Sequence, residues 1–292
     1  MANGMTQANG VVLWAVLLVG LVVAWHAASA RIAPARSSRQ LLIVADEPKP
    51  MDALAGFLRS RGKYKVRYVD QKDLPADLSQ YAGVFMYVHG RMTRRTEKRL
   101  IDYTQAGGRM IILHHGVASA RVRNPAWLRL TGIYIAPRND PKHPWRVVGN
   151  TTHTLVNLNP RHYITSHKVQ YDRTVEYLSS DSPSRPARYP ALDLHNTEVF
   201  LNQHFTDGRE KTVLFGFRCA DGGKIIMQDR SGWLKPAGKG WVLYFQPGHC
   251  ESDFRNRNYC QIILNCLTWK PGMKPAAEGP RVRPSPAAKK PA

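Results

Sequence analysis

Two adjacent histidines, His114 and His115, stand directly after an apolar run, Met110–Leu113, which itself follows a segment ending in Gly107-Gly108. The run predicts a buried β-strand, and the carboxyl end of such a strand is where open α/β sheets bind ligands. Histidine changes charge nearest neutral pH and is a common metal ligand. The pair therefore indicates acid–base or metal chemistry at a sheet edge. For either residue alone, a packed and hydrogen-bonded histidine stays open as the alternative.

The segments that must position this pair alternate between strand and helix patterns. Apolar runs predict strands, and apolar residues at helical spacing predict helices, with Thr93 as the N-cap of the second helix. Strands alternating with helices indicate a parallel sheet with right-handed crossovers. In chain order the predicted elements are strand Gln40–Ala45, helix Met51–Arg61, strand Tyr64–Val69, strand Gly83–Val88, helix Thr93–Ala106 and strand Met110–Leu113.

The rest of the chain predicts further strands and a closing helix. Ser179–Pro190 is rich in Ser, Pro and Arg and predicts a loop, while Ser231–Gly240 predicts a turn. We expect the later strands to form an antiparallel extension of the sheet. They are Glu198–Leu201, Thr212–Phe217, Lys224–Met227 and Trp241–Phe245, the last running into Gly248-His249, and the helix is Asn258–Trp269.

Four blocks of this sequence resemble the ThuA-like, or trehalose-utilisation, family. They are Tyr103–Gly108 leading to Leu113–Gly116, Val147–Leu155 with His153, Asn196–Phe200 with Glu198, and Gly238–Val242 running to Gly248-His249. The resemblance covers residues 40–269. It implies a class I glutamine-amidotransferase-like α/β fold, which is a flavodoxin-like, mostly parallel sheet with helices on both faces. Three residues, Thr154, Thr197 and Trp241, stand where the family usually has Pro, Asp and Arg.

The resemblance and the residue types give two interpretations of the site. In the first, His115, His153 and Glu198 supply nitrogen and oxygen ligands to a divalent metal, with a water in the open position. In the second, Glu198 is a general base and His114 or His115 is a general acid, which suits proton abstraction next to a carbonyl. The candidate metal ligands are thus His115, His153 and Glu198, and the candidate catalytic residues are His114, His115 and Glu198.

Other residues are candidates for binding a ligand. His89 ends the third strand, His249 stands at a strand exit, and the ring of Trp233 is a candidate for stacking on a sugar. A backbone-bonded turn histidine and a core tryptophan remain the alternatives for the last two. His162 and Glu176 are a rival match to the blocks of His153 and Glu198, so both assignments stay open.

The resemblance implies sugar metabolism, with keto-derivatives of disaccharides as substrates. We therefore expect a carbohydrate-processing enzyme, isomerase-like or hydrolase-like, with a small-molecule carbohydrate as ligand and a divalent metal as candidate cofactor. The alternative is a non-catalytic ligand-binding or scaffold domain of a membrane-associated assembly. The departures at Thr154 and Thr197 favour this alternative somewhat, and the metal content of the purified protein would distinguish the two.

A covalent thiol mechanism is not expected. In amidotransferases a cysteine occupies the turn after the equivalent strand and is activated by a nearby base. Here that turn carries His114-His115, and neither Cys nor Ser occurs before Ser119. No Cys-x-x-Cys pair is present, which argues against a thiolate zinc site. Export would permit a disulfide among the cysteines, which are Cys219, Cys250, Cys260 and Cys266.

Both ends of the 292-residue chain differ from its body. The apolar run Val11–Trp25, followed by Ala28-Ser29-Ala30, predicts a signal peptide or membrane anchor over residues 1–30, and hence an exported, periplasmic or membrane-anchored protein. Residues 270–292, rich in Pro, Ala, Lys and Arg, predict a disordered basic tail. The net charge of +21 favours contact with polyanions, but the sequence has no nucleic-acid-binding motif, so nucleic acid is not an expected partner.

Overall fold

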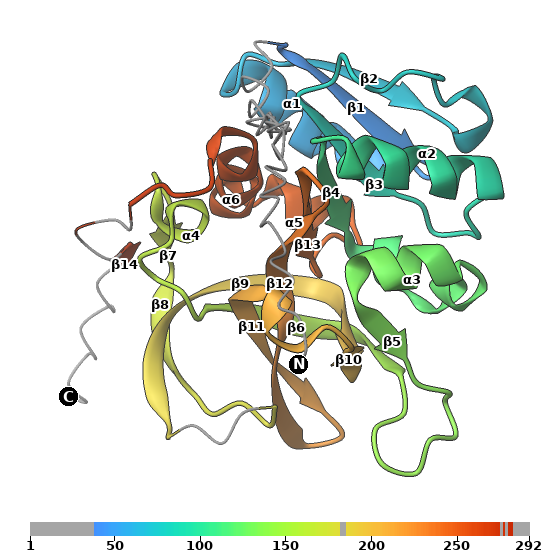
Figure 1. Cartoon of the computed structure of the whole chain (residues 1–292). Coiled ribbons are helices and arrows are strands. Elements are labelled where there is room, and N and C mark those ends of the chain that lie inside the picture. Colours follow the sequence, from blue (N-terminus) through green and yellow to red (C-terminus); the bar gives the residue numbers. More distant parts are fainter. Residues whose placement is uncertain (1–37, 182–184, 275–276, 278–279, 283–292) are drawn as a thin grey trace, which may run out of the picture. The chain divides into compact units, whose positions relative to one another are not determined.

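The computed structural model of the chain describes residues 38–181, 185–274, 277 and 280–282. Its main feature is a sheet of ten strands in the order β2-β1-β3-β4-β13-β12-β11-β6-β9-β8 (Figure 1). The first five strands of this order pair in parallel, which is the flavodoxin-like arrangement. These five strands are β1 (Gln40–Ala45), β2 (Lys65–Val69), β3 (Gly83–Tyr87), β4 (Arg109–Leu113) and β13 (Gly240–Phe245).

The other half of the sheet is antiparallel throughout. The sheet is therefore mixed, and the expectation of a mostly parallel sheet holds for the half that carries the predicted strand–helix alternation. The remaining strands of the large sheet are β6 (Arg146–Asn157), β8 (Arg173–Tyr177), β9 (Ala187–Leu201), β11 (Thr212–Asp221) and β12 (Lys224–Ala237). Short strands β5 (Ile133–Ile135) and β10 (Gln203–Phe205) pair separately.

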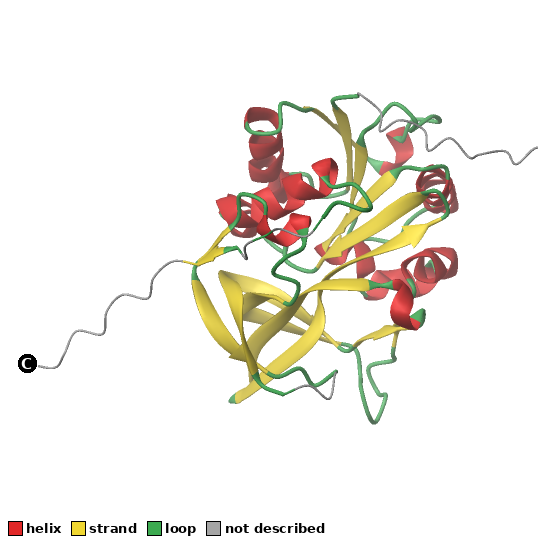
Figure 2. Ribbon diagram, turned by 60° about the vertical axis from the view of Figure 1, so that its left-hand side comes forward, coloured by secondary structure: helices red, strands yellow, loops and turns green. Residues whose placement is uncertain are grey.

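Helices cover both faces of the parallel half, because its strands are apolar on both sides. One hydrophobic cluster joins β1, β3 and β4 to α1, α5 and α6, and a second joins the same strands to α2 and α3. Figure 2 shows these helices gathered around the parallel strands, with the long antiparallel strands extending away from them. The helices are α1 (Asp52–Ser60), α2 (Arg94–Gln105), α3 (Pro125–Thr131), α4 (Tyr163–Ser166), α5 (Glu251–Arg255) and α6 (Arg257–Thr268).

The predicted helices and parallel strands agree with the structure to within a residue or two. Thr93 caps α2, because its hydroxyl accepts a hydrogen bond from the backbone N–H of Thr96. The strand that precedes the histidine pair, β4, lies between β3 and β13 in the interior of the sheet. The carboxyl end of β4 is therefore surrounded by other strand ends.

Two segments that the sequence predicted as turn or loop contain strand residues in the structure. The segment Ser231–Gly240, predicted as a turn, is mostly strand, because β12 continues to Ala237 and pairs with β13. The turn shrinks to the residues around Gly238, which has a φ of 61°. Likewise Ala187–Pro190, predicted as loop, belongs to β9 and pairs with β8. In both places long-range pairing overrides the local preference of Pro, Gly and Ser for turns.

The ends of the chain are mostly outside the described residues, including the predicted signal peptide or anchor over residues 1–30. None of the helices in the described residues is long and apolar enough to cross a membrane. Within the predicted basic tail, β14 (Arg281–Val282) pairs with β7 (Gln170–Tyr171). All four cysteines are free thiols.

Candidate metal centre

The chain turns sharply as it leaves β4, and the turn places both histidines at the sheet edge. His114 has a φ of 42°, a left-handed conformation that is uncommon for a side chain of this size. Such strain costs about 1–3 kcal/mol and is concentrated at functional sites. Gly116 lets the backbone pass close to the sheet, since a Cβ there would lie 2.2 Å from Cγ2 of Ile112.

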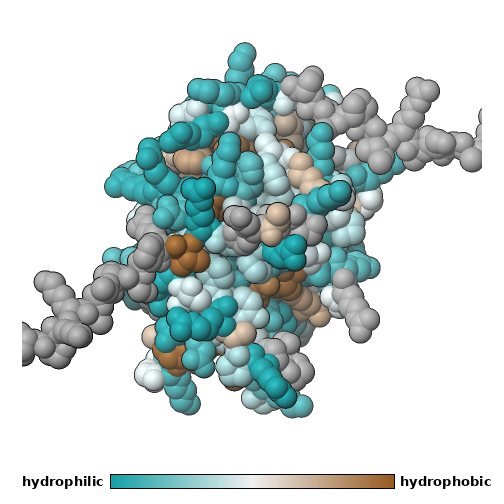
Figure 3. Space-filling model, turned by 90° about the vertical axis from the view of Figure 1, so that its left-hand side faces the viewer, coloured by the Kyte–Doolittle hydropathy of each residue, from teal (hydrophilic) through white to brown (hydrophobic). Residues whose placement is uncertain are grey.

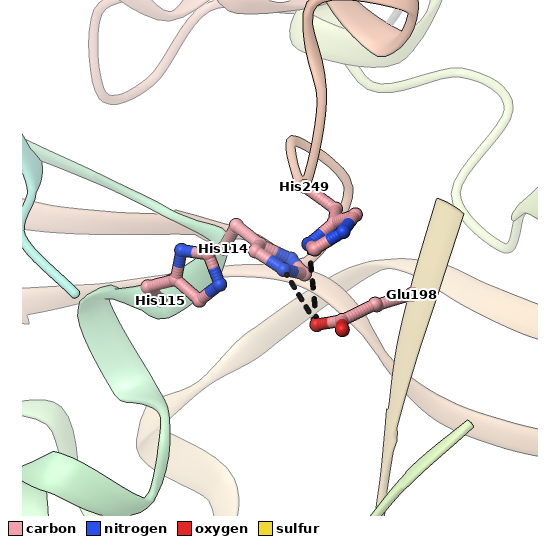
Figure 4. Close-up of side chains that lie close together, drawn as sticks. All are labelled: His114, His115, Glu198 and His249. Carbon is pink, nitrogen blue, oxygen red and sulfur yellow. Dashed lines mark ion pairs between the residues drawn. The ribbon is translucent and has the colours of Figure 1, made fainter. Parts of the chain in front are cut away.

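Four side chains from three separate segments converge beyond this turn (Figure 4). His114 and His115 follow β4, Glu198 comes from β9, and His249 follows β13. One ligand atom from each residue can be chosen so that all four atoms lie within 4.8 Å of one another. Glu198 Oε2 is 3.4 Å from His114 Nε2 and 3.3 Å from His249 Nδ1. Ligand atoms bound at about 2.1 Å to one tetrahedral ion lie about 3.4 Å apart, so these two separations fit a shared metal.

The hydrogen bonds of His114 identify which ring nitrogen can bind a metal. Its Nδ1 is 2.6 Å from the carbonyl oxygen of Gln246, which can only accept, so Nδ1 carries the proton. The Nε2 lone pair then faces the carboxylate of Glu198, and Nε2 has no hydrogen-bond partner. Two electron-rich atoms face each other favourably only with a cation or a proton between them. This is the arrangement of a metal-binding histidine held by an outer carbonyl.

Burial and charge set the protonation of the four residues. Burial lowers the pKa of His114, and it lowers the pKa of His115 to about 2, with the neighbouring His114 adding to the effect. The imidazoles of His114 and His249, whose nitrogens lie 3.4 and 3.3 Å from its Oε2, hold the pKa of Glu198 well below its ordinary value. The same carboxylate raises the pKa of His249. At neutral pH His114 and His115 are therefore neutral imidazoles and Glu198 is an ionised carboxylate, which are the forms that bind metals. His249, whose pKa is raised, would release a proton on binding a metal.

A buried carboxylate, Asp253, ties together the segments that carry Glu198 and His249. Its Oδ2 accepts hydrogen bonds from the hydroxyl of Thr197, at 2.7 Å, and from the backbone N–H of Gly248, at 3.0 Å. The hydroxyl of Tyr87 donates to the carbonyl of Gly248 at 2.8 Å. Each of the two ligands is thus anchored through its preceding residue.

The residues that follow β1 and β3 lie beside the centre. The ring of His89 stacks on that of His115, with ring centroids 4.1 Å apart and planes 4° apart. Its Nδ1 is 3.5 Å from a carboxylate oxygen of Glu47, and both side chains are 58% exposed. The backbone N–H groups of His89 and Gly90 donate to Asp46, which fixes the position of the His89 loop.

The ThuA family model, described as trehalose utilisation, matches residues 40–270. The chain belongs to the ThuA family. A ThuA-like protein from Parabacteroides merdae is 13% identical, with a TM-score of 0.56 over 84% of this chain and 97% of that one. A cytoplasmic protein from Salmonella typhimurium is 14% identical, with a TM-score of 0.50 over 78% and 98%. At these identities the likeness shows the fold alone, and no curated protein matches the chain.

In this ThuA domain, His153 was predicted to be a metal ligand, but it is not one of the four clustered residues. Its side chain is fully buried, and its Nε2 is 2.6 Å from the hydroxyl of Ser231. Burial lowers its pKa to about 3, so it is neutral. His249, predicted only to line the pocket, takes the place expected for His153 among the four clustered residues.

Trp233 cannot stack on a sugar, because its side chain is completely buried. Its ring packs between Phe205 and Tyr244, with centroids 6.1 and 5.3 Å away. The tryptophan is therefore a core residue, and the prediction that it binds ligand is wrong. β12 continues through this position, and Trp233 belongs to one of the hydrophobic clusters of the core.

The rival pair, His162 and Glu176, is not part of the centre. The Nδ1 of His162 accepts a hydrogen bond from the backbone N–H of Ile164 at the start of α4. Glu176 is exposed on β8, a strand at the edge of the sheet.

Sequence reasoning missed Asp46, Glu47, Gln246 and Asp253. Asp46 and Glu47 directly follow β1, so the strand-end rule that found His114 could have found them. Nothing local marks Gln246 and Asp253 as partners of the centre, since their contacts lie on other segments.

Proposed function

We propose that this ThuA domain is a metal-dependent carbohydrate-processing enzyme that acts on keto-derivatives of sugars. His114, His115, His249 and Glu198 would hold the metal. The observation that supports this is the unpartnered Nε2 of His114 facing the ionised Glu198 at 3.4 Å, an arrangement that a bound cation would stabilise. When bound, a divalent metal of the kind that imidazole prefers would polarise a substrate carbonyl.

His89 is the proposed proton-transfer group. Its ring lies against His115 at the edge of the centre, is more than half exposed, and is paired with Glu47. A histidine oriented by a carboxylate can move a proton to or from a carbon next to a polarised carbonyl, as a sugar isomerase requires. The exposed position of His89 gives a substrate access without disturbing the buried His114.

The test combines metal analysis of the purified protein with a turnover screen on keto-disaccharides. His115→Ala should lose both the metal and turnover. His89→Ala should keep the metal and lose about 100-fold or more of turnover, the scale of a general acid or base. Cys250→Ser, next to His249, should change neither, because no thiol chemistry is proposed.

Two other outcomes of this test would favour a different function. Turnover without metal would favour direct acid–base chemistry by Glu198 and a histidine. Neither metal nor turnover with any keto-sugar would favour the non-catalytic binding or scaffold domain instead.

We also propose that the protein is exported or tethered to a membrane. The support is the apolar run Val11–Trp25 and the small residues of Ala28-Ser29-Ala30 that follow it. Mature protein should begin near Arg31 on N-terminal sequencing if the segment is cleaved. An intact Met1 in the membrane fraction would indicate an anchor, and recovery of intact Met1 in the soluble cytoplasmic fraction would contradict the proposal.

A further inference from the structure

A cavity of about 710 Å³ lies away from the four clustered residues. It is bordered by the start of β1 and β2, the end of α1, α4 and α6, and we call it the basic groove after its four cationic residues, Arg39, Arg61, Lys168 and Arg257. The amino ends of β1 and β2 lie at the opposite edge of the parallel strands from the carboxyl end of β4. The basic groove and the metal centre are therefore separate sites.

The charge of the basic groove is of one sign. No Asp or Glu among the described residues lines it, and within the described part of the chain Arg61, Lys168 and Arg257 form no ion pair. The guanidinium of Arg39 donates to the carbonyl of Gly62, which keeps it at the rim. A concave surface lined by one sign of charge concentrates ions of the opposite sign. The groove is therefore suited to an anion.

The other residues that line the groove indicate which chemical groups the anion has besides its charge. Amide and hydroxyl groups of Ser38, Asn258, Gln261 and Thr268 line the groove beside the rings of tyrosines. One of these rings, Tyr163, already stacks on His167, with centroids 4.6 Å apart, so a flat base cannot be sandwiched on that face. The side of the molecule that carries α4 and α6 is largely hydrophilic (Figure 3). Such a lining fits a ligand with many hydroxyl groups.

We propose that the basic groove binds an anionic sugar, meaning a sugar that carries a phosphate or a carboxylate. The cations would hold the anionic group, and the amides and hydroxyls would bond to the sugar hydroxyls. This site does not depend on the proposed metal chemistry. Its function would be to recognise a charged carbohydrate at a distance from the catalytic centre.

The test is calorimetric titration of the full chain with glucose 6-phosphate and with glucuronate, which distinguish a phosphate from a carboxylate. Glucose and inorganic phosphate are the reference probes. We expect one or both anionic sugars to bind more tightly than either reference. Lys168→Glu with Arg257→Glu should weaken that binding about 10-fold or more, since charge-assisted hydrogen bonds are lost.

A matched control separates the groove from the overall charge. Arg94→Glu with Arg95→Glu makes the same charge change on the exposed face of α2 and should leave binding within about 2-fold. Equal losses in both double variants, tighter binding of inorganic phosphate or AMP than of the sugars, or no binding at about 10 mM probe would overturn the proposal. So would loss of binding in His115→Ala alone, which would place the ligand at the metal centre.

Discussion

Glu198 is the residue on which the proposed metal centre depends most, because its Oε2 lies close to two imidazoles at once. Glu198→Gln removes the negative charge and should weaken Zn²⁺ binding by about 100-fold or more, since even outer-shell partners are worth roughly 10–100-fold. Competition with a chromogenic chelator measures this affinity directly. Glu176→Gln, an exposed carboxylate on β8, is the control and should bind as the wild type does. An unchanged affinity in Glu198→Gln would mean that the ligand set is wrong.

The buried histidines should make the metal-free domain sensitive to acid. Burial lowers the pKa of His115 to about 2 and that of His153 to about 3, from an ordinary 6.5. Below about pH 6.5 the unfolded chain therefore binds protons that the folded chain cannot, so the free energy of unfolding falls as pH falls. The depressed pKa of Glu198 acts in the same direction below 4.5. His249, with its raised pKa, acts oppositely: its contribution is lost as pH rises through that pKa.

His153→Gln tests this sensitivity while all four clustered side chains are retained. The variant removes one titrating group, so its Tm should fall less than that of the wild type between about pH 7 and pH 5. Thermal unfolding of metal-free protein at several pH values measures the slope. His195→Gln, at an exposed histidine on β9, is the matched control. A slope identical in His153→Gln and wild type would show that His153 is not the group that resists protonation.

At the residue scale, the sequence pointed to the clustered residues themselves more readily than to the residues that contact them. His114 and His115 could be located because an apolar strand must end where they stand. Glu198 and His249 followed from the family blocks. That His153 would bond to Ser231 could not be foreseen, because this contact depends on the register between distant strands. The same holds for Gln246, whose carbonyl fixes the ring of His114.

At the scale of elements, the bond between Thr197 and Asp253 fastens β9 to the segment that carries His249. Thr197→Val keeps the shape but removes the hydroxyl, leaving the buried carboxylate with one donor fewer, a loss of about 1–3 kcal/mol. We expect a lower Tm and a metal affinity reduced roughly 10-fold, as for other outer-shell partners. Thr197→Ser retains a hydroxyl and should recover most of both. Equal values in the two variants would mean that the hydroxyl does not position the centre.

The same bond shows how Thr197 fits at a position where the ThuA resemblance led us to expect Asp. A second carboxylate beside the buried Asp253 would be repelled, whereas a hydroxyl donates to it at 2.7 Å. The sequence also did not predict the full length of two strands. β9 and β12 extend well beyond their predicted segments because each pairs with neighbours on both sides, and pairing tolerates Pro190 and Pro236.

At the scale of the whole domain, the centre joins the two halves of the mixed sheet. His114, His115 and His249 follow strands of the parallel half, whereas Glu198 belongs to the antiparallel half. The sequence predicted the parallel half closely, since strand–helix alternation determines its topology. The family blocks singled out Glu198, but the sequence could not predict that β9 brings it next to both His114 and His249, because that requires the order of all ten strands.

Metal binding should therefore stabilise both halves together. A ligand that binds only the folded state at about 100 times its Kd adds about 2.7 kcal/mol, which for a domain of this size raises Tm by roughly 5–10 °C. We expect one cooperative thermal transition that moves upward with Zn²⁺ and returns with a chelator. His249→Ala should show little of this Tm shift, because the metal ligand that follows β13 is gone. The variant should otherwise fold as the wild type does. Two separate transitions, with only one responding to metal, would mean that the centre lies within one half rather than between them.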